Sequence, residues 1–340
     1  MKKSKLDLIL LFAVIMISLF GVMMIYSSSS IWAEYKFNNP YKYLITQSVF
    51  LVVGTILMII ISKISYTYYL DKANTLLFGC FVLLILVIIP GIGTVRNGSR
   101  SWFGIGGFGI QPSEFMKLAM IVFVSKYLYK NNKDIKNIKK GILPILGVTL
   151  FAFGLIMLQP DFGTGVILVM SIIGLLFISG VNMKFFLILG IFGVIGATLL
   201  IIIAPYRFQR ILSFLNPWLD PLGTGFQAIQ SLFAIGPGGL LGLGLGNSIQ
   251  KHFYLPEPQT DFIFSIISEE LGFLGIIIVS ALFLTIIYRG IKISLNSRDL
   301  FSKYLSFGII FQISFQALLN LMVVVGLIPI TGYTLRDNWM

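Results

Sequence analysis

Three carboxylates lie close together in an otherwise apolar part of the chain. Asp261 stands where a proline-rich approach passes into an apolar helix, and Glu269 and Glu270 follow inside the helical part of Tyr254–Gly275. Ionisable groups at membrane depth are costly, so by default they indicate a functional site. Asp261, at the head of this junction, is therefore the first candidate for a functional residue.

Helical phase separates the three acids. On a helix that begins near Thr260, we expect Glu270 to point nearly opposite Asp261, into the apolar side, as a structural partner of a buried base or hydroxyl. The role of Glu269 stays open between structure and chemistry. The 3.6-residue period places small and polar residues on one stripe, which we expect to face a groove: Asp261, Ser265, Ser268, Gly272 and Gly275.

The composition is that of an integral membrane protein. Hydrophobic residues make up 57% of the chain and charged residues 11%, against about 25% charged in a soluble domain. The sequence predicts an all-α polytopic membrane protein, one domain over 1–340, with a large outer loop at 205–261 between spans seven and eight. Nine apolar runs are long enough to cross a bilayer: about 6–26, 44–61, 75–90, 112–129, 142–159, 162–180, 185–204, 262–288 and 303–326.

Most basic residues fall on one side of this topology. With the N-terminus inside, the inner loops and the start of the chain hold 16 of the 25 Lys and Arg residues, which is a positive-inside pattern. The net charge of +12 is therefore explained by the orientation of the chain in the membrane. Its distribution argues against a nucleic-acid partner. Cys80 is the single cysteine and His252 the single histidine, which excludes an intrachain disulfide and argues against a Cys- or His-built metal centre.

The outer loop Gly91–Gln111 holds seven glycines together with Arg96, Arg100 and Trp102. Glycines let backbone N–H groups approach a ligand closely, and arginine suits pyrophosphate. The alternative is a flexible turn with its arginines at lipid headgroups and Trp102 as an anchor. Both interpretations stay open on the residues alone.

Two further polar positions flank the fourth and sixth spans. Glu114 and Lys117 share a helix face, so they form either an intrahelical ion pair or a cation poised near an anionic headgroup. Asp161, in a tight outer hairpin, either caps the sixth span or serves as an electrostatic partner for Lys117 or an arginine.

The long outer loop contains two segments with predicted local structure. Arg207–Leu215 is typical of a short interfacial helix with snorkelling bases, including Arg207 and Arg210. Gly236–Gly246 has six glycines in eleven residues. We expect it to form a re-entrant or membrane-surface turn, with phosphate cradling as the alternative.

Four separated motifs carry a family resemblance. Tyr254–Gly275, Gln111–Leu118, Gln159–Gly165 and 207–232 together resemble the SEDS family of FtsW, RodA and SpoVE, and YLPEPQTDFIF is closer to the FtsW/SpoVE branch. The resemblance implies a ten-helix peptidoglycan glycosyltransferase of the bacterial cytoplasmic membrane. Such an enzyme polymerises lipid II at the outer face beside a class B penicillin-binding transpeptidase and divisome or sporulation proteins.

The resemblance also assigns residues. Asp261 matches the family's essential aspartate in the TDF motif, and cavity-lining positions match Trp102, Glu114, Lys117 and Asp161. After GLIPITG at Gly326–Gly332 the family continues into a tenth helix, whereas this sequence ends in Tyr333–Met340. We therefore expect the last family helix to be missing from this sequence.

The implied chemistry needs one base and several cations. Joining an acceptor hydroxyl to an undecaprenyl-pyrophosphate-linked donor does not need a strong acid, because pyrophosphate leaves as a stable anion once cations neutralise it. Asp261 is the expected base, in an inverting transfer, and Glu257 is an expected substrate contact. A divalent cation stays open as a cofactor. The expected pyrophosphate contacts are Arg96, Arg100, Lys117, Arg207 and Arg210.

Two alternatives remain for the function. Charged residues within a cavity would also suit a lipid II flippase, although the strong motifs lie at the outer face and none at an inner gate. A chain without its last helix could instead be an inactive scaffold that recruits division or sporulation proteins.

Overall fold

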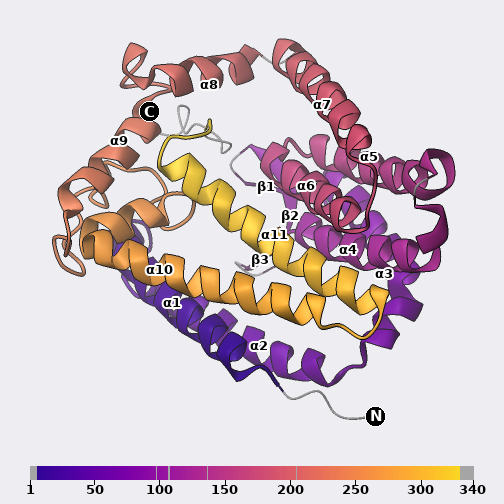
Figure 1. Cartoon of the computed structure of the whole chain (residues 1–340). Helices are drawn as coiled ribbons and strands as arrows, with labels where there is room; N and C mark the ends of the chain where they lie inside the picture. Colours follow the sequence, from indigo (N-terminus) through magenta and orange to yellow (C-terminus); the bar gives the residue numbers. More distant parts are fainter. Residues whose placement is uncertain (1–5, 97, 106–107, 136, 204, 330–340) are drawn as a thin grey trace. The chain divides into compact units, whose positions relative to one another are not determined.

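The computed structural model describes residues 6–96, 98–105, 108–135, 137–203 and 205–329, and its elements follow one another as in Figure 1. It is mostly helical, which confirms the all-α polytopic fold expected from the apolar runs. Each expected span coincides with one helix: α1 (Leu8–Phe37), α2 (Lys42–Lys63), α3 (Tyr66–Ile88), α4 (Pro112–Lys130), α5 (Leu143–Met157), α6 (Phe162–Ile178), α7 (Met183–Ile203), α10 (Ile263–Leu295) and α11 (Leu300–Val324).

Length and hydropathy separate these helices into groups. Among the described residues, six helical segments are long and apolar enough to cross a membrane: α1, α2, α3, the segment 138–157 that contains α5, α10 and α11. The shorter apolar helical segments are α6 and Met183–Gly196 of α7. α4 carries charged side chains along its length, including Glu114 and Lys117. The chain is a multi-pass membrane protein, and the number of its spans stays a prediction.

The chain forms two compact units. The first unit contains the described residues up to Lys63, then Ile201–Arg289 and those from Ala317 onward, and the second contains Ile64–Leu200 and Gly290–Gln316. That the whole chain acts as one functional domain stays a prediction.

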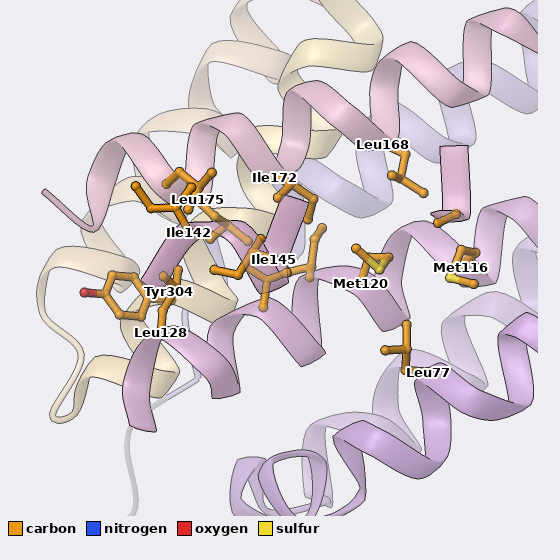
Figure 2. Close-up of a cluster of buried hydrophobic side chains, with 14 of the residues drawn as sticks. Leu77, Met116, Met120, Leu128, Ile142, Ile145, Leu168, Ile172, Leu175 and Tyr304 are labelled. Atoms are coloured by element: carbon orange, nitrogen blue, oxygen red, sulfur yellow. The ribbon is translucent and has the colours of Figure 1, made fainter. Parts of the chain in front are cut away.

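The second unit is built around apolar side chains from facing helices. Figure 2 shows this core, with α4 contributing Met116 and Met120 and α6 contributing Leu168 and Ile172. Glycine allows α6 to meet α11 closely, since a Cβ on Gly174 would lie 2.8 Å from the Phe311 ring. Short turns at Asn132–Asp134 and at the π-helical Ile138–Ile142 lead from α4 to α5.

The glycine-rich loop before α4 forms a small sheet, so the expectation of a flexible turn is wrong. β1 (Thr94–Arg96), β2 (Ser99–Ile105) and β3 (Phe108–Ile110) pair antiparallel in the order β1-β2-β3. The Ser99 hydroxyl donates to the backbone carbonyl of Gln159. That bond ties the sheet to the hairpin that precedes α6.

The first unit joins α1 and α2 to the long outer loop and α10. Its core contains Met24 of α1, Leu255 and Phe262 of the loop, Ile266 of α10 and Val324 of α11. The loop begins with α8 (Pro205–Leu215), which confirms the short helix expected over Arg207–Leu215. It continues through a turn at Pro217–Leu219, the helix α9 (Phe226–Ile235) and a second turn at Gly236–Gly238.

Candidate functional site

Asp261 lies in the turn before α10, which begins at Ile263 and not near Thr260 as expected. Its side chain is exposed, while Phe262 beside it is only 2% exposed and Leu255, earlier in the loop, 1%. The Asn320 side chain donates from Nδ2 to the Asp261 backbone carbonyl at 3.1 Å. The backbone of Asp261 is thus fixed between buried anchors, and its carboxylate is presented to the surroundings.

The environment of Asp261 makes its carboxyl a better base. The carboxyl keeps an accessible surface, but neighbouring protein atoms displace much of its hydration, and this desolvation raises its pKa. The negative charge of Glu257 raises the pKa further. Glu257 is held in place by the Thr260 hydroxyl, which donates to its carboxylate at 3.2 Å. A base whose pKa is shifted toward neutrality accepts a proton more readily at the working pH.

The predicted groove-facing stripe on α10 is wrong for two reasons. Gly272 has φ 60° and ψ −154°, so the helix is kinked there and a single helical phase does not continue through it. Ser265 and Ser268 are fully or almost fully buried, and the Ser265 hydroxyl is hydrogen-bonded to the Ser231 hydroxyl at 2.8 Å. These small residues therefore serve packing inside the first unit.

Glu270 is buried against a base and a hydroxyl, the surroundings expected for it, and its structural role stays a prediction. The Ser27 hydroxyl donates to Glu270 Oε2 at 2.6 Å, and Lys251 Nζ lies 3.0 Å from Glu270 Oε1. Glu269 is buried too and accepts from the Ser248 hydroxyl and the Ile249 backbone N–H. In the structure, therefore, neither glutamate faces solvent.

The glycine-rich segment Gly236–Gly246 packs its backbone directly on the kink of α10. A Cβ on Gly238 would lie 2.0 Å from the Ser268 carbonyl oxygen, and one on Gly242 would lie 2.2 Å from that of Glu270. The N–H groups of residues 242, 243 and 244 all donate to protein carbonyls. A phosphate cradle built from these amides is therefore wrong, because its donors are already used.

In the second unit Lys117 and Glu114 form the expected intrahelical ion pair. Their Nζ and Oε1 atoms lie 2.9 Å apart; the Lys117 side chain is fully buried and that of Glu114 is 47% exposed. Lys117 also donates to Gln316 Oε1 at 3.0 Å. The buried ammonium is thus held by one charged and one neutral acceptor, and its role toward a substrate headgroup stays a prediction.

Asp161 caps α6, as one of the two interpretations predicted. Its Oδ1 accepts from the Thr164 backbone N–H at 3.2 Å, and its Oδ2 accepts from Gln111 Nε2 at 2.6 Å. The second contact joins the residue before α4 to the start of α6. Within the described part of the chain, these two donors are the hydrogen-bond partners of the Asp161 carboxylate, so a pairing with Lys117 is not seen.

The remaining predicted contacts divide between the two units. Arg100 and Trp102 lie half-buried on β2 of the second unit, and Arg210 lies half-buried on α8 of the first. The side chains of Arg96 and Arg207 lie outside the described residues. The described residues contain no cluster of three or more His, Cys, Asp or Glu side chains that could hold a metal ion. The substrate-binding roles of all these residues stay predictions.

Sequence reasoning missed the partners of the buried acids, Lys251 and Ser27, and the Asn320 contact. A signal existed for Lys251, because two buried carboxylates require a nearby cation or several donors. Lys251 is the one Lys or Arg between Arg210 and Arg289. No comparable signal pointed to Asn320.

Comparisons with known proteins agree on one family. Residues 7–336 match a family described as FTSW_RODA_SPOVE, cell cycle protein. The chain is 49% identical to Stage V sporulation protein E of Bacillus subtilis over 98% of this chain and 91% of that protein. It is 38% identical to the probable peptidoglycan glycosyltransferase FtsW of Geobacter metallireducens over 97% of this chain and 88% of that protein.

Solved structures give the same relationship. One described as "Structural coordination of polymerization and crosslinking by a peptidoglycan synthase complex" matches with a TM-score of 0.73 and 30% identity, over 94% of this chain and 89% of that chain. The Rod shape determining protein RodA of Thermus thermophilus matches with a TM-score of 0.63 and 26% identity, over 94% of this chain and 87% of that chain.

Proposed function

Because the chain belongs to the FtsW, RodA and SpoVE family of cell cycle proteins, we propose that it is a peptidoglycan glycosyltransferase that polymerises lipid II into glycan strands. The observation that carries the proposal is the presentation of Asp261. It is an exposed carboxylate on a fixed backbone at the head of an apolar helix, and desolvation raises its pKa.

The proposed reaction is a single inverting displacement. Asp261 removes the proton of the acceptor hydroxyl as the oxygen bonds to the anomeric carbon of the donor. The bond from that carbon to the undecaprenyl pyrophosphate breaks, and the pyrophosphate leaves with the electron pair. A cation would neutralise the leaving group, and Arg210, half-buried in the same unit as Asp261, is a candidate for it. One carboxylate suffices because the leaving anion needs no proton, unlike the alkoxide released in glycoside hydrolysis.

The charge pattern supports an orientation for this reaction. The excess of Lys and Arg on one set of loops favours a cytoplasmic N-terminus in the bacterial cytoplasmic membrane. Asp261 then lies at the outer face, where a lipid-linked donor would be met. The partner we propose is a class B penicillin-binding transpeptidase, supported by the likeness to a peptidoglycan synthase complex that coordinates polymerization and crosslinking. Divisome or sporulation proteins are the wider partners, in line with the names of the relatives.

The test is Asp261→Asn, purified with its transpeptidase partner and supplied with labelled lipid II. Loss of general-base assistance is expected to lower the polymerisation rate by about 10²–10⁴. Asp134→Asn, an exposed change of the same chemistry in an inner loop, is the matched control and should keep the wild-type rate. Undiminished polymer from Asp261→Asn would remove Asp261 as the base. Transport of labelled lipid II across sealed vesicles by wild type, without polymer, would instead indicate a flippase.

A further inference from the structure

Glu269 and Glu270 form a fully buried pair of adjacent carboxylates in the first unit, called here the carboxylate pair. Burying a charge is costly unless it is paired and hydrogen-bonded. Two neighbouring buried acids are therefore maintained only by a dedicated set of donors. That set comes from the loop segment Ser248–Lys251 and from α1.

Glu269 holds the backbone of the loop. Its carboxylate accepts from the Ser248 hydroxyl at 2.5 Å, from the Ile249 N–H at 2.8 Å and from the Gln250 N–H at 3.4 Å. Successive backbone donors that converge on one carboxylate resemble the capping of a helix N-terminus. These directional bonds fix the register of the loop against α10.

Glu270 joins three elements at one point. It accepts from the Ser27 hydroxyl of α1, from Lys251 Nζ and, at 3.3 Å, from the Ser248 N–H. Lys251 Nζ also donates to the Gly246 carbonyl at 2.5 Å. The lysine thus supplies the charge that Glu270 needs and closes the end of the glycine-rich segment onto the same site.

The chain between this anchor and Asp261 is a short loop with both ends on α10. It starts at Ser248, bound to Glu269, and it ends where Asp261 enters the helix that carries Glu269 two turns later. Inside the loop Phe253 has φ 66° and Glu257 φ 48°, a backbone region that non-glycine residues rarely adopt. Strained residues of this kind persist only where the surrounding structure holds them.

We infer that the carboxylate pair and Lys251 are positioning residues, which lock the loop 248–261 so that Asp261 is presented in one geometry. The inference rests on the proposed function for its effect on turnover. None of the three side chains touches substrate; they act through the loop backbone. A misplacement of about 1 Å at a reacting group can cost about 10²-fold in rate. A loop with a fixed conformation would therefore maintain the rate by keeping Asp261 in position.

The test compares two variants of the carboxylate pair and Lys251, called the anchor variants, with a control. Glu269→Gln removes the charge without changing the shape, and the double variant Lys251→Met/Glu270→Met removes the buried ion pair with both of its charges. Glu34→Gln, an exposed acid on α1, is the matched control. Replacing both partners of a buried pair by apolar groups is often neutral for folding, so the double variant separates positioning from stability.

Two measurements decide the inference. Hydrogen exchange at the Ile249 and Gln250 amides should become roughly tenfold faster in Glu269→Gln, because their acceptor loses its charge, and remain unchanged in Glu34→Gln. In the polymerisation assay both anchor variants should lose roughly tenfold or more in kcat, with KM within about twofold of wild type.

Three outcomes would overturn the inference. The first is a double variant that is folded and polymerises at the wild-type rate. The second is unchanged amide exchange in Glu269→Gln. The third is failure of both variants to fold, which would place the pair in folding and not in positioning. Absence of polymer from the wild type would contradict the proposed function alone, since amide exchange tests the lock without substrate.

Discussion

Gly242 and Gly246 both have a positive φ but lie in very different surroundings. Gly242 has φ 78° and Gly246 φ 81°. A Cβ on Gly242 would lie 2.2 Å from the Glu270 carbonyl oxygen, whereas one on Gly246 would meet nothing within 4 Å. Alanine at either position meets the penalty of a positive φ, so the difference between the two variants reports mainly the close approach of Gly242 to α10.

The size of that difference follows from the contacts. Both variants share a left-handed backbone cost of about 1–2 kcal/mol. Gly242→Ala adds about 1–3 kcal/mol for the overlap with backbone atoms that must move. It also weakens the bonds from Leu243 N to Glu269 O and from Gly244 N to Glu270 O, both 2.9 Å, which contribute about 0.5–1.5 kcal/mol each. The additional cost of Gly242→Ala is therefore about 2–6 kcal/mol, and at about 2–4 °C per kcal/mol we expect this variant to unfold roughly 4–24 °C below Gly246→Ala.

The assay is thermal unfolding of both purified variants in the same detergent, followed by a polymerisation measurement at a temperature where both are folded. Equal melting temperatures for Gly242→Ala and Gly246→Ala would refute the argument that the glycine-rich segment is selected for close packing.

Two predictions concern pH. The Arg289 side chain lowers the pKa of Asp7 by hydrogen bonding, at 2.6 Å from Nη2 to Oδ2. The stability that this ion pair contributes is fully present at pH values above the pKa of Asp7 in the unfolded chain, about 3.9. It is lost as the pH falls through the lower pKa of Asp7 in the folded protein. Asp7→Asn should therefore lower the melting temperature at pH 7 by a few degrees, for a loss of about 1 kcal/mol. The difference in melting temperature between wild type and Asp7→Asn should shrink as the pH falls below about 4. For the reaction, Glu257→Gln removes the charge that helps to raise the pKa of Asp261, so the acid limb of the polymerisation profile should move to lower pH.

A specific result would refute each of these two pH predictions. A difference between wild type and Asp7→Asn that persists undiminished at acid pH would mean that the ion pair is not its source. An acid limb that stays in place or moves to higher pH in Glu257→Gln would separate Glu257 from the titration of the base. Glu34→Gln, which changes an exposed acid on α1, is the control for the second measurement.

The helices were predictable because apolar runs of membrane length have few alternatives. The run at 262–288 begins within a residue of α10, but the helix continues to Leu295. The prediction ended too early because the last turns of the helix carry polar residues, which lower the hydropathy. The small sheet before α4 was missed. The Asn97-Gly98 dipeptide is a hairpin signal, but the many glycines around it favoured a turn.

The site was predictable only in its local parts. The Glu114–Lys117 pair and the Asp161 cap follow from spacings of three residues, which a sequence displays directly. The bond between Ser27 and Glu270 joins residues 243 positions apart, and no single sequence reveals such a pairing. The kink at Gly272 was missed because a glycine inside an apolar run is compatible with a continuous helix. A Cβ on Gly272 would lie 2.4 Å from the Gly242 backbone nitrogen, a close approach that the sequence does not reveal.

The pairing of Ser27 with Glu270 also constrains how the protein is made. Synthesis at about 5–20 residues per second separates these two residues by about 12–50 seconds, given the 243 positions between them. Lys251 precedes Glu270 by only 19 residues, so the acid can meet its counter-charge as a local hairpin soon after it leaves the ribosome. The helix α1 can pack on α2 as soon as both are inserted, but its bond from Ser27 to Glu270 forms only after α10 has entered the bilayer.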